Sequence, residues 1–323
     1  MARVFMDLTL PTAPGVTQGG PEPAWHAARV SEVRQERVVS GGRRLDVVSA
    51  GPPGGGVFLF QAGTPSAAVP FHPAVEAVTA RGLRFATYSR PGYAGSAPHP
   101  GRTVADAAAD VTAVLDHLDA PWFVTVGWSG GGPHALACAA LLPERCRGAA
   151  TIAGVAPFRA DGLDWLAGMG EENLEEFGAA LQGGAVLTPW LERAAAQLRD
   201  ITPADVAAAL GDLVSDVDRA SLTGEFAEWT ASSFRAAVST GVAGWRDDDL
   251  AFVAPWGFDI GAIVRPVMVW QGDQDRMVPL AHGRWLAEHV AGATSRLRRG
   301  EGHLSLGVGA FDEIVDELTA LAG

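Results

Sequence analysis

The chain has 323 residues, of which 48% are hydrophobic and 19% are charged, so it is long enough for one large domain or a domain with an insertion, and apolar enough for a sizeable core. Its 24 Lys and Arg residues against 37 Asp and Glu residues give a net charge of −13 with no basic stripe, which argues against nucleic acid and an anionic membrane surface as partners. The two cysteines, Cys138 and Cys146, are too few for a disulfide scaffold, and we expect both to be buried thiols in a reducing compartment.

The first 28 residues are rich in Pro and Gly and predict an irregular N-terminal arm over 1–28. They lack the continuous apolar core of a signal peptide. No later apolar run approaches the roughly 18 residues of a transmembrane helix. We therefore expect a soluble cytoplasmic protein with no membrane partner.

The segment 29–157 alternates predicted strands and predicted helices. Helical patterns occur near 70–80, after Thr103, and over 131–142, and Thr103 with Asp106 three residues on gives a capping-box-like start. The runs that predict strands are VRQERVVS, RLDVVSAG, VFLFQAG, RFATYSR, WFVTVGW and RGAATIAG. The nearly all-apolar run WFVTVGW is typical of a strand buried on both faces of a parallel sheet.

Residues 158–255 differ in character, with Ala, Leu, Glu and Trp segments and little strand pattern, and predict a helical insertion of about 100 residues. The alternation returns over 256–323, with strand PVMVWQG, a helix at 280–291, strand TSRLRR, and a final helix near 309–321. This order predicts an α/β fold with a mostly parallel central sheet flanked by helices.

The stretch TVGWSGGGPHALA, residues 125–137, places Ser129 between a predicted strand and a predicted helix. A serine hydroxyl becomes a useful nucleophile when it is exposed beside a base and donors hold the oxyanion that it creates. A sharp strand-to-helix turn supplies both, and Gly127 and Gly131 leave room for the close packing around such a turn. Since a short Gly-x-Ser-x-Gly also occurs by chance in a glycine-rich chain, the flanking strand and helix carry the prediction of a nucleophile.

The motif Gly127-Trp128-Ser129-Gly130-Gly131 resembles the nucleophile elbow of the α/β-hydrolase family. The resemblance covers most of residues 40–323 and implies the α/β-hydrolase fold, with 29–157 and 256–323 as the core and 158–255 in the place of the family's cap. It also implies a catalytic triad in the chain order Ser, acid, His.

The resemblance implies Asp275 as the acid, because it lies in a Gly-x-x-Asp-x-x-Val-Pro stretch after a predicted buried strand. Its role would be to accept the imidazole N–H and stabilise the imidazolium. Asp273 is the nearest alternative, with a turn or helix-cap role as its other interpretation, and Asp161 or Asp164 is a more distant one. The base would be His303 in RRGEGHLSLG, after the last predicted strand; a loop histidine that binds a backbone carbonyl is the alternative.

The same resemblance places an oxyanion hole at the backbone N–H groups of Thr64 and Gly130. Two departures from the family pattern accompany it: Ala62 stands where histidine is usual, and Ser89 where aspartate is usual. Both change side chains that brace loops, whereas the expected donors are backbone groups.

No Cys or His spacing predicts a metal site, and no cofactor is implied. The acidic run Asp247-Asp248-Asp249 is interpreted as a solvated surface loop. Aromatic residues of the insertion are mostly expected in its core, while Trp128, Trp165 and Trp256 are expected to contact substrate.

These features predict a carboxylesterase-like serine hydrolase that cleaves an ester or lactone. The expected partner is a small to medium hydrophobic acyl substrate, and a homodimer is left open. Amide or peptide, carbon–carbon, thioester, perhydrolase and cofactor-free lyase chemistry fit the same residue set. Epoxide or haloalkane hydrolysis would instead be indicated by an aspartate nucleophile. A ligand-binding member without catalysis is the alternative from another class, because a fold does not fix a function.

Overall fold

The computed structural model describes residues 32–321, so the irregular arm predicted for residues 1–28 lies outside the described residues. Eight strands in the described part form one sheet, at the positions where the sequence shows β-branched or apolar runs. The strands are β1 (Val33–Ser40), β2 (Arg43–Ala50), β3 (Val57–Gln61), β4 (Arg84–Tyr88), β5 (Phe123–Trp128), β6 (Cys146–Ile152), β7 (Val267–Gly272) and β8 (Thr294–Arg298).

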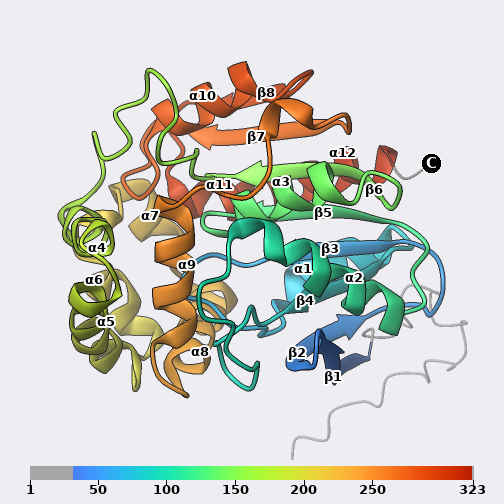
Figure 1. Cartoon of the computed structure of the whole chain (residues 1–323), viewed down its shortest axis with the longest axis horizontal. Coiled ribbons are helices and arrows are strands. Elements are labelled where there is room, and N and C mark those ends of the chain that lie inside the picture. Colours follow the sequence, from blue (N-terminus) through green and yellow to red (C-terminus); the bar gives the residue numbers. More distant parts are fainter. Residues whose placement is uncertain (1–31, 322–323) are drawn as a thin grey trace, which may run out of the picture. The chain divides into compact units, whose positions relative to one another are not determined.

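The sheet has the order β1-β2-β4-β3-β5-β6-β7-β8. β1 pairs antiparallel with β2, and β2 with β4, whereas all other neighbours are parallel. Parallel neighbours need crossover connections, and helices supply most of them (Figure 1). The mostly parallel sheet flanked by helices is therefore confirmed.

Helices cover the two faces of the sheet and form two core clusters. α1, α11 and α12 contribute to one cluster, and α2, α3 and α10 contribute to the other. β5 serves both, because Val124 and Val126 point into the first and Phe123 into the second. The bounds of these helices are α1 (His72–Ala80), α2 (Ala107–His117), α3 (Gly131–Leu141), α10 (Leu280–His289), α11 (His303–Gly309) and α12 (Phe311–Ala320).

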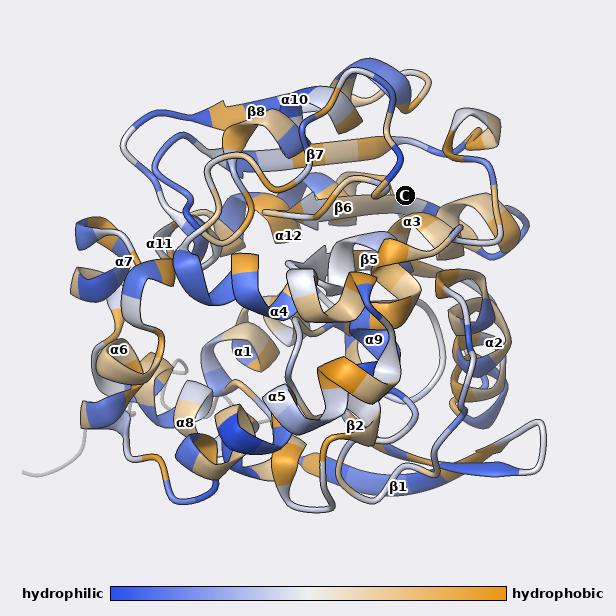
Figure 2. Ribbon diagram, turned by 60° about the vertical axis from the view of Figure 1, so that its left-hand side comes forward, coloured by the Kyte–Doolittle hydropathy of each residue, from blue (hydrophilic) through white to orange (hydrophobic). Residues whose placement is uncertain are grey.

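Local signals in the sequence explain several boundaries. The predicted capping box is present: Asp106 Oδ2 accepts from Thr103 N at 2.7 Å and from Thr103 Oγ1 at 2.9 Å, at the 3-10 turn η2 (Val104–Asp106) that leads into α2. β5 is buried along its whole length, as its apolar sequence indicates. Figure 2 shows hydrophilic residues along β1, which lies at the edge of the sheet.

Between β6 and β7 the chain forms helices and no strand, as the sequence predicts for residues 158–255. In Figure 1 these helices gather on the left of the view, at the ends to which the parallel strands point. The elements are α4 (Glu171–Leu181), α5 (Gly184–Leu198), η3 (Pro203–Asp205), α6 (Val206–Ala209), η4 (Gly211–Leu213), α7 (Asp216–Ser221), α8 (Gly224–Val238), α9 (Ala243–Val253) and η5 (Ile260–Ala262). Within residues 32–321 no helix combines the length and the apolar character that crossing a bilayer requires.

Candidate active site

Ser129 stands on a strained turn between β5 and α3. Its φ is +54°, a left-handed conformation that residues with side chains rarely adopt. The turn is held in place by the Ser129 N–H, which donates to the Ile152 carbonyl at 2.8 Å. A β-carbon on Gly127 would collide with the backbone of Gly131, and one on Gly131 would collide with the backbone of Gln61. The close packing that the motif predicts is therefore present, and it leaves the Ser129 side chain half-buried at the end of the sheet.

His303 is the first residue of α11 and lies against Asp275 in the loop after β7. His303 Nδ1 is 2.9 Å from Asp275 Oδ2 and 3.1 Å from Oδ1. Three more donors fix this carboxylate: Met277 N and Val278 N bind Oδ1, and Gln271 Nε2 binds Oδ2, all within 2.9 Å. Since a carboxylate only accepts, Nδ1 carries the ring proton and Nε2 is left to act as a base.

The pKa of His303 is set by opposing effects. Burial alone would lower this pKa, but the negative charge of Asp275 and the hydrogen bond to it outweigh burial and raise the pKa above its ordinary value of 6.5. The charge of Asp218 acts in the same direction. The site therefore stabilises an imidazolium, as a residue that takes a proton from a hydroxyl requires.

Asp218 holds the segment that carries His303. It belongs to α7, is fully buried, and accepts from the backbone N–H groups at the start of α11: His303 N at 3.1 Å, Leu304 N at 2.7 Å and Ser305 N at 3.0 Å. A carboxylate at the first turn of a helix also meets the positive end of the helix dipole. The sequence predicts a loop at His303; the structure instead begins a helix there, because Asp218 satisfies the free donors of its first turn.

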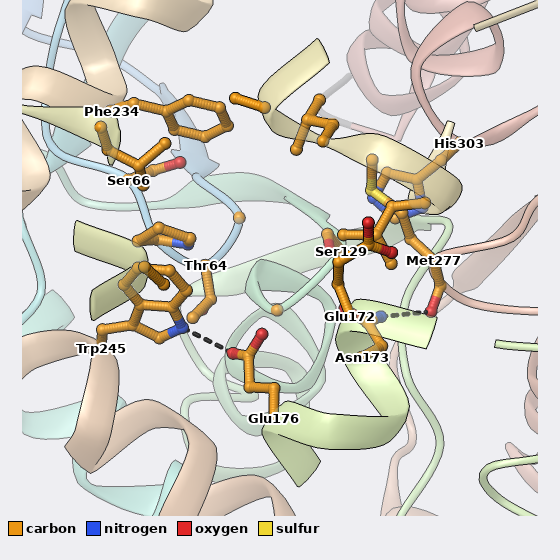
Figure 3. Close-up of a pocket in the computed structure, with 18 of the residues that line it drawn as sticks. Thr64, Ser66, Ser129, Glu172, Asn173, Glu176, Phe234, Trp245, Met277 and His303 are labelled. Carbon is orange, nitrogen blue, oxygen red and sulfur yellow. Dashed lines mark hydrogen bonds between the residues drawn. The ribbon is translucent and has the colours of Figure 1, made fainter. Parts of the chain in front are cut away.

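Ser129 and His303 line the same pocket, which has a cavity volume of about 500 Å³. One wall comes from segments that follow β3, β5, β7 and β8, and the other from α4, α5, α8 and α9. Figure 3 shows Ser129, Met277 and His303 at one side of this pocket, and Glu176 with Trp245 at the other. Asp275 contacts His303 and is not part of the lining.

The other carboxylates considered for the acid lie elsewhere. Asp273 Oδ1 accepts from Gly300 N at 2.7 Å in an exposed turn, which matches its alternative interpretation as a turn residue. Asp161 and Asp164 are exposed in the loop after β6. Of these four candidates, all within the described residues, Asp275 is the one that contacts His303.

The loop after β3 passes directly beside the serine. A β-carbon on Gly63 would lie 3.3 Å from Ser129 Cβ and 3.9 Å from Ser129 Oγ. One on Gly130 would lie 2.5 Å from Thr64 Oγ1. The segment Gly63-Thr64 therefore packs closely against the turn that carries Ser129 and Gly130.

The prediction of a solvated surface loop at Asp247-Asp248-Asp249 is wrong. All three residues lie on α9 and are buried, Asp248 and Asp249 completely. Asp248 forms ion pairs at 2.6 Å with both Arg90 and Arg102. Burial alone would raise the pKa of Asp248, but the charges of Arg102 and Arg90 outweigh it and hold the pKa well below its ordinary value. The sequence indicates a solvated surface at this run because the two arginines that pair with Asp248 lie far away in the chain.

Arg90 connects Asp248 to the loop beside the serine. Its guanidinium donates to the carbonyls of Ala62 and Gly63 and to Thr64 Oγ1, the last two at 2.8 and 2.9 Å. Thr64 Oγ1 in turn donates to Asp248 Oδ2 at 2.9 Å. The loop is therefore braced although Ala62 has no polar side chain. No motif identified Arg90, Asp248 or Asp218 as site residues, because their roles come from contacts between segments distant in the chain.

Ser89, the second departure from the family pattern, is buried and hydrogen-bonded to neighbouring segments. Its Oγ accepts from Ala68 N at 2.9 Å, and its carbonyl accepts from Ser96 Oγ at 2.7 Å. The hydroxyl thus ties β4 to the segment that follows Pro65. A small polar side chain is enough for this contact.

Of the three tryptophans predicted to contact substrate, Trp128 lines the pocket and the other two do not. The Trp165 indole donates to the Ala156 carbonyl at 2.7 Å and packs edge-on against Phe177, within the helical segment. Trp256 packs against Phe258 at a separate hollow. Sequence identifies large apolar side chains, but only packing decides which of them face a cavity.

The comparisons with known proteins agree with this architecture. A family profile described as alpha/beta hydrolase fold matches residues 56–310. A Bacillus subtilis protein named the uncharacterized hydrolase YcgS is 26% identical over 230 residues, which cover 71% of this chain and 78% of that protein.

Solved structures show the same fold at low identity. An alpha/beta hydrolase fold protein from Nakamurella multipartita has a TM-score of 0.64 at 23% identity, and the match covers 90% of this chain and 100% of that one. The esterase RhEst1 from Rhodococcus sp. ECU1013 has a TM-score of 0.61 at 18% identity, covering 90% of this chain and 99% of that one.

Proposed function

Because the chain belongs to the alpha/beta hydrolase fold family, we propose that it is a serine hydrolase that cleaves a carboxylic ester or lactone. The observation that carries the proposal is the placement of Ser129 and His303 in one pocket, with Asp275 bound to the far nitrogen of the imidazole. A nucleophile, a base and an acid that orients the base are the groups that acyl transfer needs.

In the proposed reaction, Ser129 Oγ attacks the substrate carbonyl while His303 Nε2 takes the hydroxyl proton. The backbone N–H groups of Thr64 and Gly130 stabilise the oxyanion of the tetrahedral intermediate. This intermediate collapses to an acyl-enzyme when His303 gives the proton to the leaving alkoxide. Water, activated by His303, then attacks the acyl-enzyme and releases the carboxylic acid, which restores the serine.

The proposal keeps the division of the chain predicted from the sequence, with a core at 29–157 and 256–323 and a cap at 158–255. Support comes from the pocket, since residues of α4, α5, α8 and α9 form the wall opposite the serine. Aromatic side chains are prominent on that wall, among them Phe177, Phe226, Trp229 and Phe234. A cavity of about 500 Å³ with such a lining suits a small to medium substrate with a hydrophobic acyl part.

A fluorophosphonate probe tests the nucleophile, because it reacts covalently with activated serines. We expect labelling of the unaltered protein and none of Ser129→Ala. Ser239→Ala, which removes an exposed hydroxyl at the end of α8, serves as the matched control and keeps its label. Equal labelling of Ser129→Ala and the unaltered protein would refute the assignment.

A substrate panel tests the reaction class. Esters of graded chain length, lactones, amides and thioesters are offered to the unaltered protein, with Ser129→Ala as the blank. We expect turnover of esters or lactones to exceed that of amides. Probe labelling without turnover of any class would contradict the esterase proposal while keeping the nucleophile.

A further inference from the structure

The helices between β6 and β7 line the pocket with acidic as well as aromatic side chains. Four of these side chains carry carboxyl groups: Glu172, Glu175 and Glu176 of α4, and Asp249 of α9. Arg193 of α5 is the single Lys or Arg among the described residues that line the pocket, and it is exposed and donates to the Pro189 carbonyl at 2.9 Å. The pocket therefore has an excess of carboxyl groups over cationic groups, which a purely hydrophobic acyl substrate does not explain.

Glu176 and Asp249 are the buried members of this set, with exposures of 8% and 0%. Glu176 Oε1 accepts from Trp245 Nε1 at 2.6 Å, which fixes the glutamate against the pocket (Figure 3). Asp249 has no N–H donor on either oxygen among the described residues. Asp249 hydrogen-bonds to the Glu176 carboxyl, and this bond needs a proton on one of the two acids. A buried acid pair beside a cavity, with no N–H donor on Asp249, can exchange that proton for a cationic group that the cavity receives.

The electrostatics of the pair point the same way. Burial raises the pKa of Glu176 to about 7. Burial, followed by the charge of Glu176 and a hydrogen bond to it, raises the pKa of Asp249 well above its ordinary value. The neighbouring Asp248 differs from this pair, because ion pairs with Arg90 and Arg102 compensate its charge. Within residues 32–321, no Lys or Arg forms an ion pair with Glu176 or Asp249.

We propose that Glu176 and Asp249 form a subsite for an alkylammonium group of the substrate, with Trp245 beside it. The inference rests on the proposed function, because it concerns the same substrate whose carbonyl meets Ser129. An ammonium group offers three N–H donors, enough for both carboxyl groups, and its charge replaces the missing cation. Aromatic faces favour the same ligand, and Trp190 and Trp245 both line the pocket, with ring centroids 6.4 Å apart.

An organic cation fits these groups better than a metal ion. Among the described residues, no group of three or more His, Cys, Asp and Glu side chains is placed to hold a metal. The substrate class that follows is an ester or lactone with an amino group remote from the carbonyl. Its apolar part would span the aromatic surface between the serine and the carboxyl pair.

Binding of three simple probes tests the subsite without catalysis. Hexylammonium, hexanol and hexanoate have the same chain, and each is titrated calorimetrically into the unaltered protein at pH 8, above the pKa of Glu176. We expect hexylammonium to bind at least ten times more tightly than hexanol, and hexanoate to bind more weakly than both. Similar affinities for hexylammonium and hexanol would overturn the proposal.

Isosteric variants locate the effect. Glu176→Gln and Asp249→Asn should each lower the affinity for hexylammonium at least tenfold and leave that for hexanol unchanged. Glu192→Gln, which removes one exposed charge on α5 outside the pocket, is the matched control and should leave both affinities unchanged. Should a variant fail to fold, the unaltered protein still gives an answer, because its affinity for hexylammonium should fall at least fivefold between pH 8 and pH 6. No loss of affinity in the variants, or none with pH, would refute the subsite.

A kinetic comparison separates this inference from the proposed function. Ethyl 6-aminohexanoate, in its ammonium form at pH 8, and ethyl heptanoate have nearly the same shape and differ in charge. We expect kcat/KM to favour the amino ester at least tenfold, and this preference to vanish in Glu176→Gln. Hexylammonium binding without turnover of either ester would refute the esterase and keep the subsite; equal turnover of both esters would keep the esterase and refute the subsite.

Discussion

Replacing Asp218 with Asn tests whether the helical segment positions the base. The carboxylate accepts three backbone N–H groups at the start of α11, at 2.7 to 3.1 Å. An asparagine whose oxygen takes the place of Oδ1 keeps the Leu304 and Ser305 donors and turns its NH₂ group toward the His303 N–H. Since a hydrogen bond to a charged group contributes about 1.5–3 kcal/mol, losing this one should cost about 1.5–3 kcal/mol of unfolding free energy. We expect a Tm lower by roughly 2 °C or more for each kcal/mol.

The pH profile distinguishes positioning from stability. His303 must be neutral to act as a base, so kcat/KM should rise with pH through the pKa of His303, which lies above 6.5. The charge of Asp218 contributes to that raised pKa, so Asp218→Asn should move the acid limb to lower pH and reduce kcat at the plateau. Thermal unfolding and a pH series of kcat/KM measure the two effects.

Asp216→Asn is the control for this experiment, because it removes an exposed carboxylate from the same short helix. It should change neither the Tm nor the acid limb. The reasoning would be refuted if Asp218→Asn lowered the Tm while its acid limb coincided with that of the unaltered protein. In that case Asp218 would stabilise the fold without acting on His303.

Two further predictions follow from the site. Asp275→Asn should lower kcat by a factor of at least 10³, because an amide can present N–H to His303 Nδ1 and favour the wrong tautomer of the imidazole. Asp273→Asn should change kcat less than threefold. The opposite ranking in steady-state assays would assign the role of the acid to Asp273. Glu176→Gln should stabilise the protein at high pH. The pKa of Glu176 in the folded protein is about 7 and exceeds the ordinary value of 4.5, so the carboxyl contributes stability at low pH. That stability is lost as pH rises through 7, and the loss amounts to about 3 kcal/mol. In urea unfolding, the free energy of unfolding of Glu176→Gln should exceed that of the unaltered protein by up to about 3 kcal/mol at pH 8 and by less than about 1 kcal/mol at pH 5. An equal difference at both pH values would contradict the raised pKa.

The sequence predicts those parts of the fold whose causes are local. β5 and the turn at Ser129 follow from an apolar run and from glycines at fixed offsets, and the start of α2 follows from the Thr103 and Asp106 pair. In each case the residues that decide the structure are within a few positions of one another. Short-range steric and capping effects can therefore be read without knowing the rest of the fold.

The sequence fails where the cause is a contact between distant segments. Asp248 is fixed by Arg90, 158 positions earlier, so its local sequence of three acids suggests a solvated surface. The helix at His303 depends on Asp218, 85 positions earlier. Trp165 is a large aromatic residue of the kind that lines pockets, yet its ring packs edge-on against Phe177 within the helical segment. Burial of a charge is decided by its partner, and a single sequence does not reveal the partner.

These distant contacts also limit how the proposed cap can move. Asp218 of α7 holds the base, and Asp248 of α9 holds the loop beside the serine, both through fully buried charges. Lifting either helix would leave buried cations or N–H groups without their acceptor, at a cost of about 3–5 kcal/mol for a broken buried ion pair. α7 and α9 are therefore part of the frame that positions His303 and the loop beside Ser129. Any opening that admits substrate has to come from the elements that these charges do not tie to the core.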